Sequence, residues 1–265
     1  MKIILSRKGF DGDYGKTASP ILPDGTMLSM PIPNKMDVLA KYSGIYFENH
    51  SYAKYLTDLR PKRKNHWEKW YCHLDPDIRK GTLRNNNWKP AFGQEGGPET
   101  HLIDEGVLPG DLFLFFGWFR KTINNEGKLK YSGPNIQVIY GYLQYGEKLT
   151  GDEIYSWHPH SGEHHKKYKN NAIYIPSDRL IIGEEDFGLG YGVFKFNPIL
   201  QLTKPDETRS KWSILPWMNS ELKMTHHTPA SIKEGYFQSA KRGQEFVIDA
   251  NEEILTWVKS LFTSQ

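Results

Sequence analysis

Hydrophobic positions are densest between residues 110 and 146. The segment 110–121, GDLFLFFGWFRK, follows a Pro-Gly turn and is rich in aromatic residues, and the segment 135–147, NIQVIYGYLQYGE, alternates apolar and other positions in part. Aromatic content and a period of two are typical of strands. We therefore predict two central strands with a long hairpin connection, in which INNEGKLKYSGP (123–134) forms the loop.

Shorter patterns predict the remaining elements. Residues 3–5 form a short apolar run before a glycine-bearing loop, a turn is expected at Pro23-Asp24-Gly25, and further strands are expected near 172–175, 192–195 and 245–248. Helices are predicted over 52–60, capped by Ser51 and ended by Pro61, and over 98–106, which ends at a glycine. An amphipathic helix over 251–262, capped by Asn251 or Asp249, closes the chain.

Strands dominate this pattern and do not alternate regularly with helices. The 24 glycines and 16 prolines favour many short strands and turns over a helical bundle. We predict an α+β fold, a strand-rich, curved or barrel-like mixed sheet with peripheral helices, in a single domain over residues 1–265.

Composition narrows the class of protein. Of the 265 residues, 38% are hydrophobic, and mean hydropathy is −0.64. The longest apolar run, 112–119, is far short of the roughly 20 residues of a membrane-spanning helix. A single cysteine, Cys72, excludes an internal disulfide. These features predict a cytoplasmic protein without membrane contact, and the net charge of +3 permits binding to a polyanion without requiring it.

A polar loop follows the first predicted strand and contains Arg7, Lys8, Asp11, Asp13 and Lys16. Loops at strand ends often bind ligands, and glycines let backbone amides approach an anion. We expect Lys8 to neutralise a phosphate and Asp11 to act as a base or a metal ligand. The alternative is a solvated turn in which the Asp side chain accepts hydrogen bonds from backbone amides.

The segment YCHLDPDI (71–78) places His73, Asp75 and Asp77 at alternating positions. In extended backbone these side chains share one face of a strand. A histidine with two carboxylates suits acid–base catalysis or binding of Mg²⁺, Mn²⁺ or Fe²⁺. Because Pro76 favours a turn, the alternative is that Asp75 caps a helix and that His73 is buried and hydrogen-bonded.

The segment HPHSGEHH (158–165) holds four of the ten histidines. Imidazoles at alternate positions, such as His158 and His160, are able to bind a transition metal, with Glu163 as a ligand or an orienting partner. The loop-like KKYKNN that follows supports the alternative, a flexible histidine stretch that binds nothing.

Neighbouring aromatic residues in the strand 110–120 must point to opposite sides. We expect one face to line a groove, where Trp118 or Phe119 beside Arg120 stacks a base and contacts its phosphate. The alternative is a strand buried on both faces, which is favoured for Phe113 and Phe115.

The chain resembles the nucleotide modification associated domain 3 family of bacteria and phages, from residue 2 to about residue 248. The resemblance rests on a series of short sequence phrases whose order agrees with that of the family. The phrases are ILSRKGFD, SPILPDG, MPIP, HLDPDI, FGQEGGPETHL, GDLFLFFGWFR, GYLQYGE, HPH and AKRGQEFV. The resemblance implies association with systems that make or handle modified bases in DNA, without implying a particular reaction. The phrase GGPETHL departs from the smaller residues expected before its histidine.

The resemblance and the motifs together define the candidate site. Catalytic roles are predicted for Lys8, Asp11, His73, Asp75, Asp77 and His101. Nucleotide or base contacts are predicted for Arg7, Gln94, Trp118, Phe119, Arg120, Gln244 and Glu245, and Arg242 belongs to the same last phrase as Gln244 and Glu245. Metal binding is predicted for His158 and His160, and a divalent metal is the candidate cofactor. We expect Lys8, Asp11, His73, Asp75 and His101 to converge around one cleft.

Two functions fit these residues best. The first is a component of a DNA or nucleotide base-modification system, an enzyme or enzyme-like domain whose partners are a nucleotide or DNA and other base-modification proteins. The alternative is a non-catalytic reader of modified DNA or RNA, similar to barrels of the PUA and EVE kind through PGDLFLFFG and IYGYLQ. Such a reader would bind through Lys62, Arg63, Lys64, Lys166 and Lys167. A purely structural or protein-interaction module is the third possibility.

Overall fold

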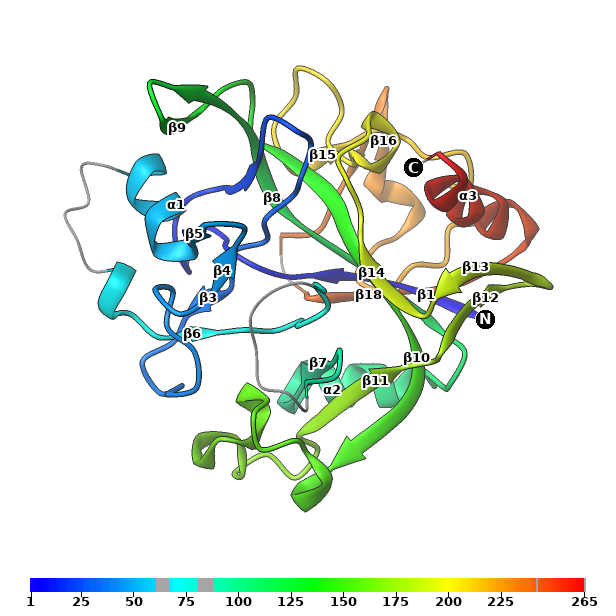
Figure 1. Cartoon of the computed structure of the whole chain (residues 1–265). Helices are drawn as coiled ribbons and strands as arrows, with labels where there is room; N and C mark the ends of the chain where they lie inside the picture. The colour runs from blue at the N-terminus through cyan, green and yellow to red at the C-terminus, as the bar shows by residue number, and fades with distance from the viewer. Residues whose placement is uncertain (61–66, 81–87, 242, 265) are drawn as a thin grey trace.

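The structure is a computed structural model that describes residues 1–60, 67–80, 88–241 and 243–264. Its main sheet, as far as these residues show, has nine strands. They are β1 (Lys2–Arg7), β2 (Ser19–Ile21), β7 (Phe92–Gln94), β8 (Leu112–Asn125), β9 (Lys128–Tyr131), β10 (Ile136–Thr150), β11 (Ala172–Pro176), β14 (Tyr191–Val193) and β18 (Glu245–Asp249). The path β18-β1-β8-β10-β11-β7 crosses the centre of the molecule (Figure 1).

The sheet is mixed and curls into a half-barrel. Strand β1 runs parallel to β8, with Ile3 opposite Leu112, and antiparallel to β18, with Lys2 opposite Asp249. Strands β8 and β10 form the expected antiparallel pair, and their register shifts between Ile139 and Gly141. The predicted class, a strand-rich, curved mixed sheet with peripheral helices, is confirmed.

Three α-helices of the described chain lie around the sheet, α1 (Tyr52–Leu59), α2 (Gly96–Asp104) and α3 (Glu252–Thr263) (Figure 1). The Ser51 side chain caps α1 and the Asn251 side chain caps α3, as the sequence indicated. Helix α2 begins two residues before the predicted start at Pro98. None of the described helices combines the length and the apolar character that crossing a membrane demands.

Smaller sheets and short 3₁₀ helices make up the rest. The small sheets pair β3 (Ile32–Pro33) with β6 (Cys72–His73), β4 (Tyr46–Phe47) with β5 (His50–Ser51), β12 (Arg179–Ile182) with β13 (Glu185–Leu189), and β15 (Lys211–Trp212) and β16 (Ile232–Lys233) with β17 (Tyr236–Gln238). The 3₁₀ helices are η1 (Trp67–Lys69), η2 (Gly151–Glu153), η3 (Pro159–Ser161), η4 (Glu163–His165), η5 (Pro198–Leu200) and η6 (Pro229–Ser231).

The predicted loop at 123–134 is wrong over residues 123–131, which form a hairpin. Strand β8 continues to Asn125, and β9 folds back on it with Thr122 opposite Tyr131. The turn that joins them is Glu126-Gly127, where both residues have positive φ. A two-residue turn of this kind suits a tight hairpin, so the polar composition of the segment reflects an exposed hairpin.

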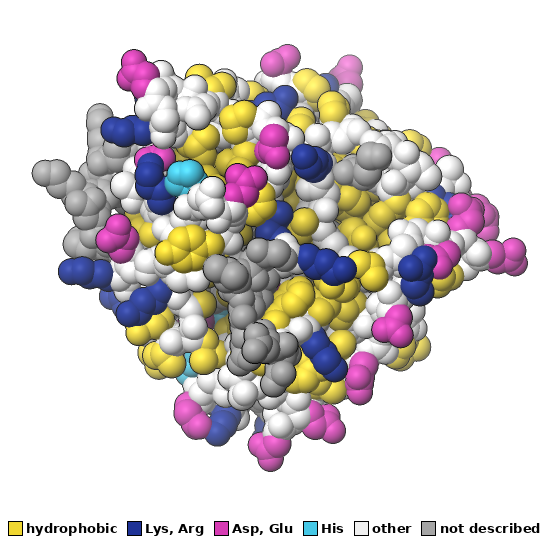
Figure 2. Space-filling view, in the orientation of Figure 1, with side chains coloured by type: hydrophobic (Ala, Val, Ile, Leu, Met, Phe, Trp, Pro, Cys, Tyr) yellow, Lys and Arg dark blue, Asp and Glu magenta, His cyan; other side chains and the backbone are white. Residues whose placement is uncertain are grey.

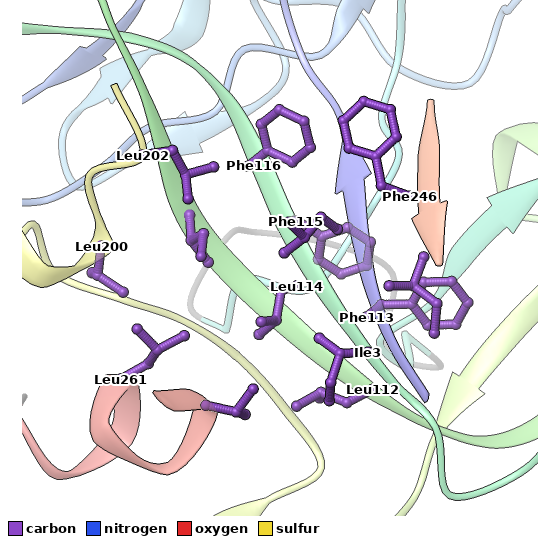
Figure 3. Close-up of a cluster of buried hydrophobic side chains, with 14 of the residues drawn as sticks. Ile3, Leu112, Phe113, Leu114, Phe115, Phe116, Leu200, Leu202, Phe246 and Leu261 are labelled. Atoms are coloured by element: carbon purple, nitrogen blue, oxygen red, sulfur yellow. The ribbon is translucent and has the colours of Figure 1, made fainter. Parts of the chain in front are cut away.

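The first part of β8, residues 112–119, is almost entirely buried, and a period of two sends its rings to opposite faces of the sheet. Phe113 and Phe115 pack on Phe92, whereas Phe116 packs on Trp212 and Phe246. Figure 3 shows this core from β1 and β8 to Leu261 of α3. A second core lies around α1, where the rings of Phe10, Tyr42 and Trp67 pack against one another.

The surface carries mixed charge. On the face shown in Figure 2, Lys and Arg side chains are interspersed with Asp and Glu. This distribution agrees with the small net charge of the chain.

Candidate functional site

Residues from distant parts of the sequence line one cavity of about 1050 Å³. Strand β1 ends at Arg7 and is followed by Lys8, and Trp118 lies on the parallel neighbour β8, two residues after the partner of Arg7, Phe116. Strand β6 contributes His73, and strand β7 contributes Gln94. Ligand pockets of about 300–1,000 Å³ hold small molecules, so this cavity has room for a nucleotide.

A close backbone approach fixes the start of the polar loop. The Lys8 N–H donates to the Phe116 carbonyl at 2.9 Å, and a Cβ on Gly117 would lie 2.6 Å from the Lys8 oxygen. Glycine at residue 117 therefore lets the loop after β1 lie directly against β8.

Three imidazoles line the cavity, and an oxygen acceptor orients each of them. The Nδ1 atoms of His73, His160 and His165 lie 2.8 Å from Asp37 Oδ2, 2.6 Å from Asn171 Oδ1 and 2.6 Å from Glu95 Oε2. The ring centroids lie 5.1 Å apart for His73 and His160, 5.5 Å for His73 and His165, and 4.6 Å for His160 and His165. An acceptor at Nδ1 holds the proton of a neutral ring on that nitrogen, which leaves the Nε2 lone pair available.

Asp75 adds a buried carboxylate to this group. Its Oδ1 accepts a hydrogen bond of 2.6 Å from the Gly93 N–H, and His158 Nε2 lies 3.6 Å from the same oxygen. Burial would raise the pKa of the Asp75 carboxyl, but His158, His160 and Lys8 lower it to about 2. Asp75 is therefore ionised at neutral pH.

The histidines differ in their protonation. Burial disfavours the His165 cation, but the carboxylates of Asp37 and Glu95 outweigh it and raise the pKa of His165 to about 9. Burial lowers the pKa of His160 well below its ordinary value, against the opposing attraction of Asp75. Near pH 7 the His160 ring is therefore neutral, and the His165 ring carries a proton shared with its acidic neighbours.

Overlapping groups of these residues have donor atoms close enough to hold a metal ion. The groups are Asp37 with His73 and His165, His73 with Asp75 and His160, and Glu95 with His160 and His165, and within each the ligand atoms lie within 4.8 Å of one another. Imidazole nitrogen and carboxylate oxygen suit divalent transition metals. We call these residues, together with Asn171, the histidine–carboxylate cluster.

A buried ion pair stands beside the cluster. Lys8 Nζ lies 3.0 Å from Glu245 Oε1, which also accepts a hydrogen bond of 2.6 Å from Gln94 Nε2. The ammonium group lies 4.3 Å from the centre of the Phe92 ring. Since Lys8 is paired with Glu245, its charge is partly neutralised in the absence of a ligand.

A second wall of the cavity combines an aromatic ring with guanidinium groups. The Arg209 guanidinium lies 3.9 Å from the centre of the half-buried Trp118 ring, whose Nε1 donates to Asn135 Oδ1 at 2.9 Å. Arg7 donates to the carbonyls of Ala240 and Lys241. Flat rings and guanidinium groups are surfaces on which nucleobases stack.

The cavity unites many of the residues predicted from the sequence. The predicted residues that line it are Arg7, Lys8, Asp11, His73, Asp75, Gln94, Trp118, His160 and Gln244. Of the five residues that were expected to converge around one cleft, four line this cavity, and His101 does not. Asp11 is also the turn residue of the alternative interpretation, because its Oδ1 accepts from the N–H groups of Asp13 and Tyr14.

Other predicted residues lie outside the cavity lining. Phe119 has no exposed surface and packs on Tyr140, so it cannot stack a base in this structure. Asp77 accepts from Trp88 Nε1 and pairs its backbone with Ala91, so it does not share a face with His73 and Asp75.

The remaining outliers have structural partners of their own. His101 Nε2 lies 3.0 Å from Thr225 Oγ1, and Arg120 donates to the Gly133 carbonyl. His158 is fully buried behind Asp75 and belongs to none of the potential metal groups of the described residues, and Glu245 is buried in the ion pair with Lys8. Three predicted contact residues of the reader alternative, Lys62, Arg63 and Lys64, lie outside the described residues, as does Arg242 of the last phrase.

Sequence reasoning missed several members of the site. Asp37, Asn171 and Arg209 stand in segments without a motif, and Glu95 belongs to a quoted phrase but was not singled out, so only their contacts reveal them. Gly93 and His165 carried a signal, since they belong to the glycine-rich phrase after residue 91 and to the histidine-rich segment.

The fold and the cavity define a class of protein, a strand-rich α+β domain in which a half-barrel sheet positions a histidine–carboxylate cluster next to an aromatic and cationic wall. The chain belongs to the nucleotide modification associated domain 3 family, whose pattern matches residues 2–249. Membership associates the chain with nucleotide modification systems. No curated protein and no solved structure matches the chain significantly.

Proposed function

We propose that the chain is an enzyme of a base-modification system that acts on a nucleotide or on a base of DNA held in this cavity. The observation that carries the proposal is the union of a histidine–carboxylate cluster and an aromatic, cationic wall in one cavity. Active sites are assembled in this way from distant segments. The proposed substrate is charged, and the family that the chain resembles occurs in bacteria and phages. We therefore propose that the protein is cytoplasmic and that its partners are other base-modification proteins.

The aromatic wall supports the binding half of the proposal. A base that stacks on Trp118 would take the place of, or lie beside, the Arg209 guanidinium, which lies over the ring at 3.9 Å from its centre. Arg7 and Lys8 line the same cavity and provide positive charge for a phosphate. Gln94 and Gln244 add amide groups for the edge of a base.

The histidine–carboxylate cluster supports the chemical half. In the proposed reaction His73 and Asp75 carry out acid–base or metal-assisted chemistry, with Lys8 and Asp11 next to the reacting group. Asp75 is ionised and His160 is neutral, so the cavity contains both a base and an imidazole that does not repel a cation.

The test is turnover by the purified chain. Nucleotides and DNA are incubated with the wild type and with Asp75→Asn, and altered bases are detected by mass spectrometry. We expect Asp75→Asn to reduce turnover at least about 100-fold, the scale of a lost general base, while binding of the nucleotide persists. Unchanged turnover would remove Asp75 from the mechanism.

The reader alternative is supported by the same Trp118–Arg209 pair, which needs no catalytic group to bind a base. A reader is expected to bind oligonucleotides with a strong salt dependence and to leave them chemically unchanged. Binding without any altered product, with and without added divalent metals, would therefore favour the reader over the enzyme.

A further inference from the structure

One group within the histidine–carboxylate cluster differs from the other two. In the groups that contain Asp37 and Glu95, the carboxylate is hydrogen-bonded to a histidine of the same group, His73 or His165. No side-chain hydrogen bond among the described residues joins His73, Asp75 and His160 to one another. Asp37 and Glu95 therefore act as orienting partners, whereas the side chains of the third group are not bonded to one another.

The hydrogen bonds fix which nitrogen of each ring is available. The His73 and His160 Nδ1 atoms face Asp37 Oδ2 and Asn171 Oδ1, and the Asn171 Nδ2 donates to the His160 carbonyl at 2.8 Å. Because the Asn171 side-chain nitrogen already donates to this carbonyl, its side-chain oxygen faces the His160 ring. The His160 Nδ1 atom therefore carries the proton. Metal-binding histidines commonly use this arrangement, in which an acceptor at one nitrogen orients the other toward the ion.

The spacing of the rings matches that of two imidazoles on one ion. A metal–nitrogen bond of about 2.0–2.1 Å places the centre of each ring roughly 3.2 Å from the metal, so two ligands have centres about 4.5 Å apart at an octahedral angle and about 5.2 Å apart at a tetrahedral angle. The observed separation of His73 and His160 is 5.1 Å. Asp75 adds a carboxylate whose Oδ1 is held by the Gly93 N–H.

An unpartnered imidazole nitrogen points to the same ligand. His165 is buried and lines the cavity, and its Nε2 has no hydrogen-bond partner within the described part of the chain. Its ring centroid lies 4.6 Å from that of His160. Since these two rings are nearly parallel, at 11°, one of them must rotate before both can face a single ion.

We infer that His73, Asp75 and His160 bind a divalent transition-metal ion, with His165 as the adjacent imidazole. Two imidazoles and one carboxylate select Fe²⁺, Mn²⁺, Co²⁺ or Zn²⁺ over Mg²⁺ and Ca²⁺, which prefer oxygen ligands throughout. All three side chains line the cavity, so further coordination positions face the space proposed for the nucleotide. Such an ion polarises a bound oxygen or lowers the pKa of a bound water. The inference deepens the proposed function, on which it rests for the identity of the substrate.

Titration of the metal-free wild type with Co²⁺ or Zn²⁺ alone tests the site. Calorimetry and the visible absorption of Co²⁺ should report one ion per chain. We expect His73→Ala, Asp75→Ala and His160→Ala each to weaken binding at least about 100-fold, and Asn171→Ala to weaken it about 10–100-fold, as for lost orienting partners. His50→Ala, an exposed histidine on β5, is the matched control and should bind like the wild type.

Two results would overturn the inference, namely a wild type that binds neither ion at micromolar concentration, and ligand variants that keep full affinity. Far-ultraviolet circular dichroism identifies variants that fail to fold, and Asn171→Ala then provides the test without removing a ligand. Nucleotide binding, measured separately, keeps the two proposals apart. Co²⁺ binding without nucleotide binding contradicts only the proposed function, and nucleotide binding without Co²⁺ or Zn²⁺ binding contradicts only the metal site.

Discussion

Gly93 and His160 lie so close that a side chain on residue 93 would overlap the imidazole. A Cβ built on Gly93 would lie 2.3 Å from His160 Cδ2 and 2.5 Å from its Nε2. The Gly93 N–H also donates to Asp75 Oδ1 at 2.6 Å. One residue of β7 thus makes room for a histidine of the cluster and anchors its carboxylate.

Gly93→Ala should therefore displace the His160 ring. We expect at least about a 10-fold weaker affinity for Co²⁺, because a displaced ring loses its alignment with the other ligands, and a loss of about 1–3 kcal/mol in the free energy of unfolding from overpacking. Calorimetry and urea denaturation measure the two effects. Gly97→Ala is the matched control, since a Cβ there meets no atom within 4 Å. Equal behaviour of the two variants would contradict the steric role of Gly93.

The buried pair of Lys8 and Glu245 predicts a large loss of stability when one partner is removed. Lys8→Ala leaves Glu245, whose side chain is fully buried, with only the Gln94 hydrogen bond to offset its charge. An uncompensated buried charge costs about 3–5 kcal/mol in the free energy of unfolding. Lys54→Ala, which removes the more exposed pair with Asp58 on α1, should cost less than about 1 kcal/mol by the same urea denaturation. Similar losses in the two variants would show that burial of the Lys8 pair has no energetic consequence.

Trp118→Ala should weaken the binding of a nucleotide or oligonucleotide. Stacking of a base on an aromatic ring contributes about 1–3 kcal/mol, so the expected loss is about 5-fold to 150-fold in affinity. Fluorescence anisotropy with a labelled oligonucleotide measures it. Trp70→Ala is the control, because Trp70 is also partly exposed but lies outside the cavity lining. A loss confined to Trp70→Ala would place the base elsewhere.

His227 predicts a pH dependence of stability next to the site. Its Nε2 accepts from the Ala240 N–H and its Nδ1 donates to the Thr225 carbonyl. Burial, with smaller contributions from His226 and Arg7, lowers the pKa of His227 to about 4, although the bond to Thr225 opposes the shift.

Between pH 6.5 and pH 4 the unfolded chain therefore takes up a proton at His227 that the folded chain does not. The free energy of unfolding should fall as the pH falls through this window and should be unaffected by this group above it. Urea denaturation at several pH values measures the dependence, and His227→Gln should reduce its slope. An identical slope in the wild type and the variant would mean that His227 titrates alike in both states.

Local patterns were sufficient for the helix caps and the central strands. Ser51 and Asn251 are recognisable because a cap needs only one side chain and the amides three residues on. Strands β8 and β10 are recognisable because long runs of apolar and aromatic residues are typical of buried strands. The hairpin of β8 and β9 was missed because its exposed residues have the composition of a loop, and only pairing with a neighbour makes them a strand.

The sequence alone determined the class of fold, the family and the presence of Lys8, His73, Asp75 and His160 among the candidates, since these depend on residue types and their local order. The tertiary structure alone decided that Phe119 enters the core, that Asp77 turns to Trp88, and that Asp37, Glu95 and Asn171 orient the imidazoles. These choices depend on contacts between segments far apart in the chain. Such contacts form only when burial of the shared core brings those segments together, so no local pattern encodes them.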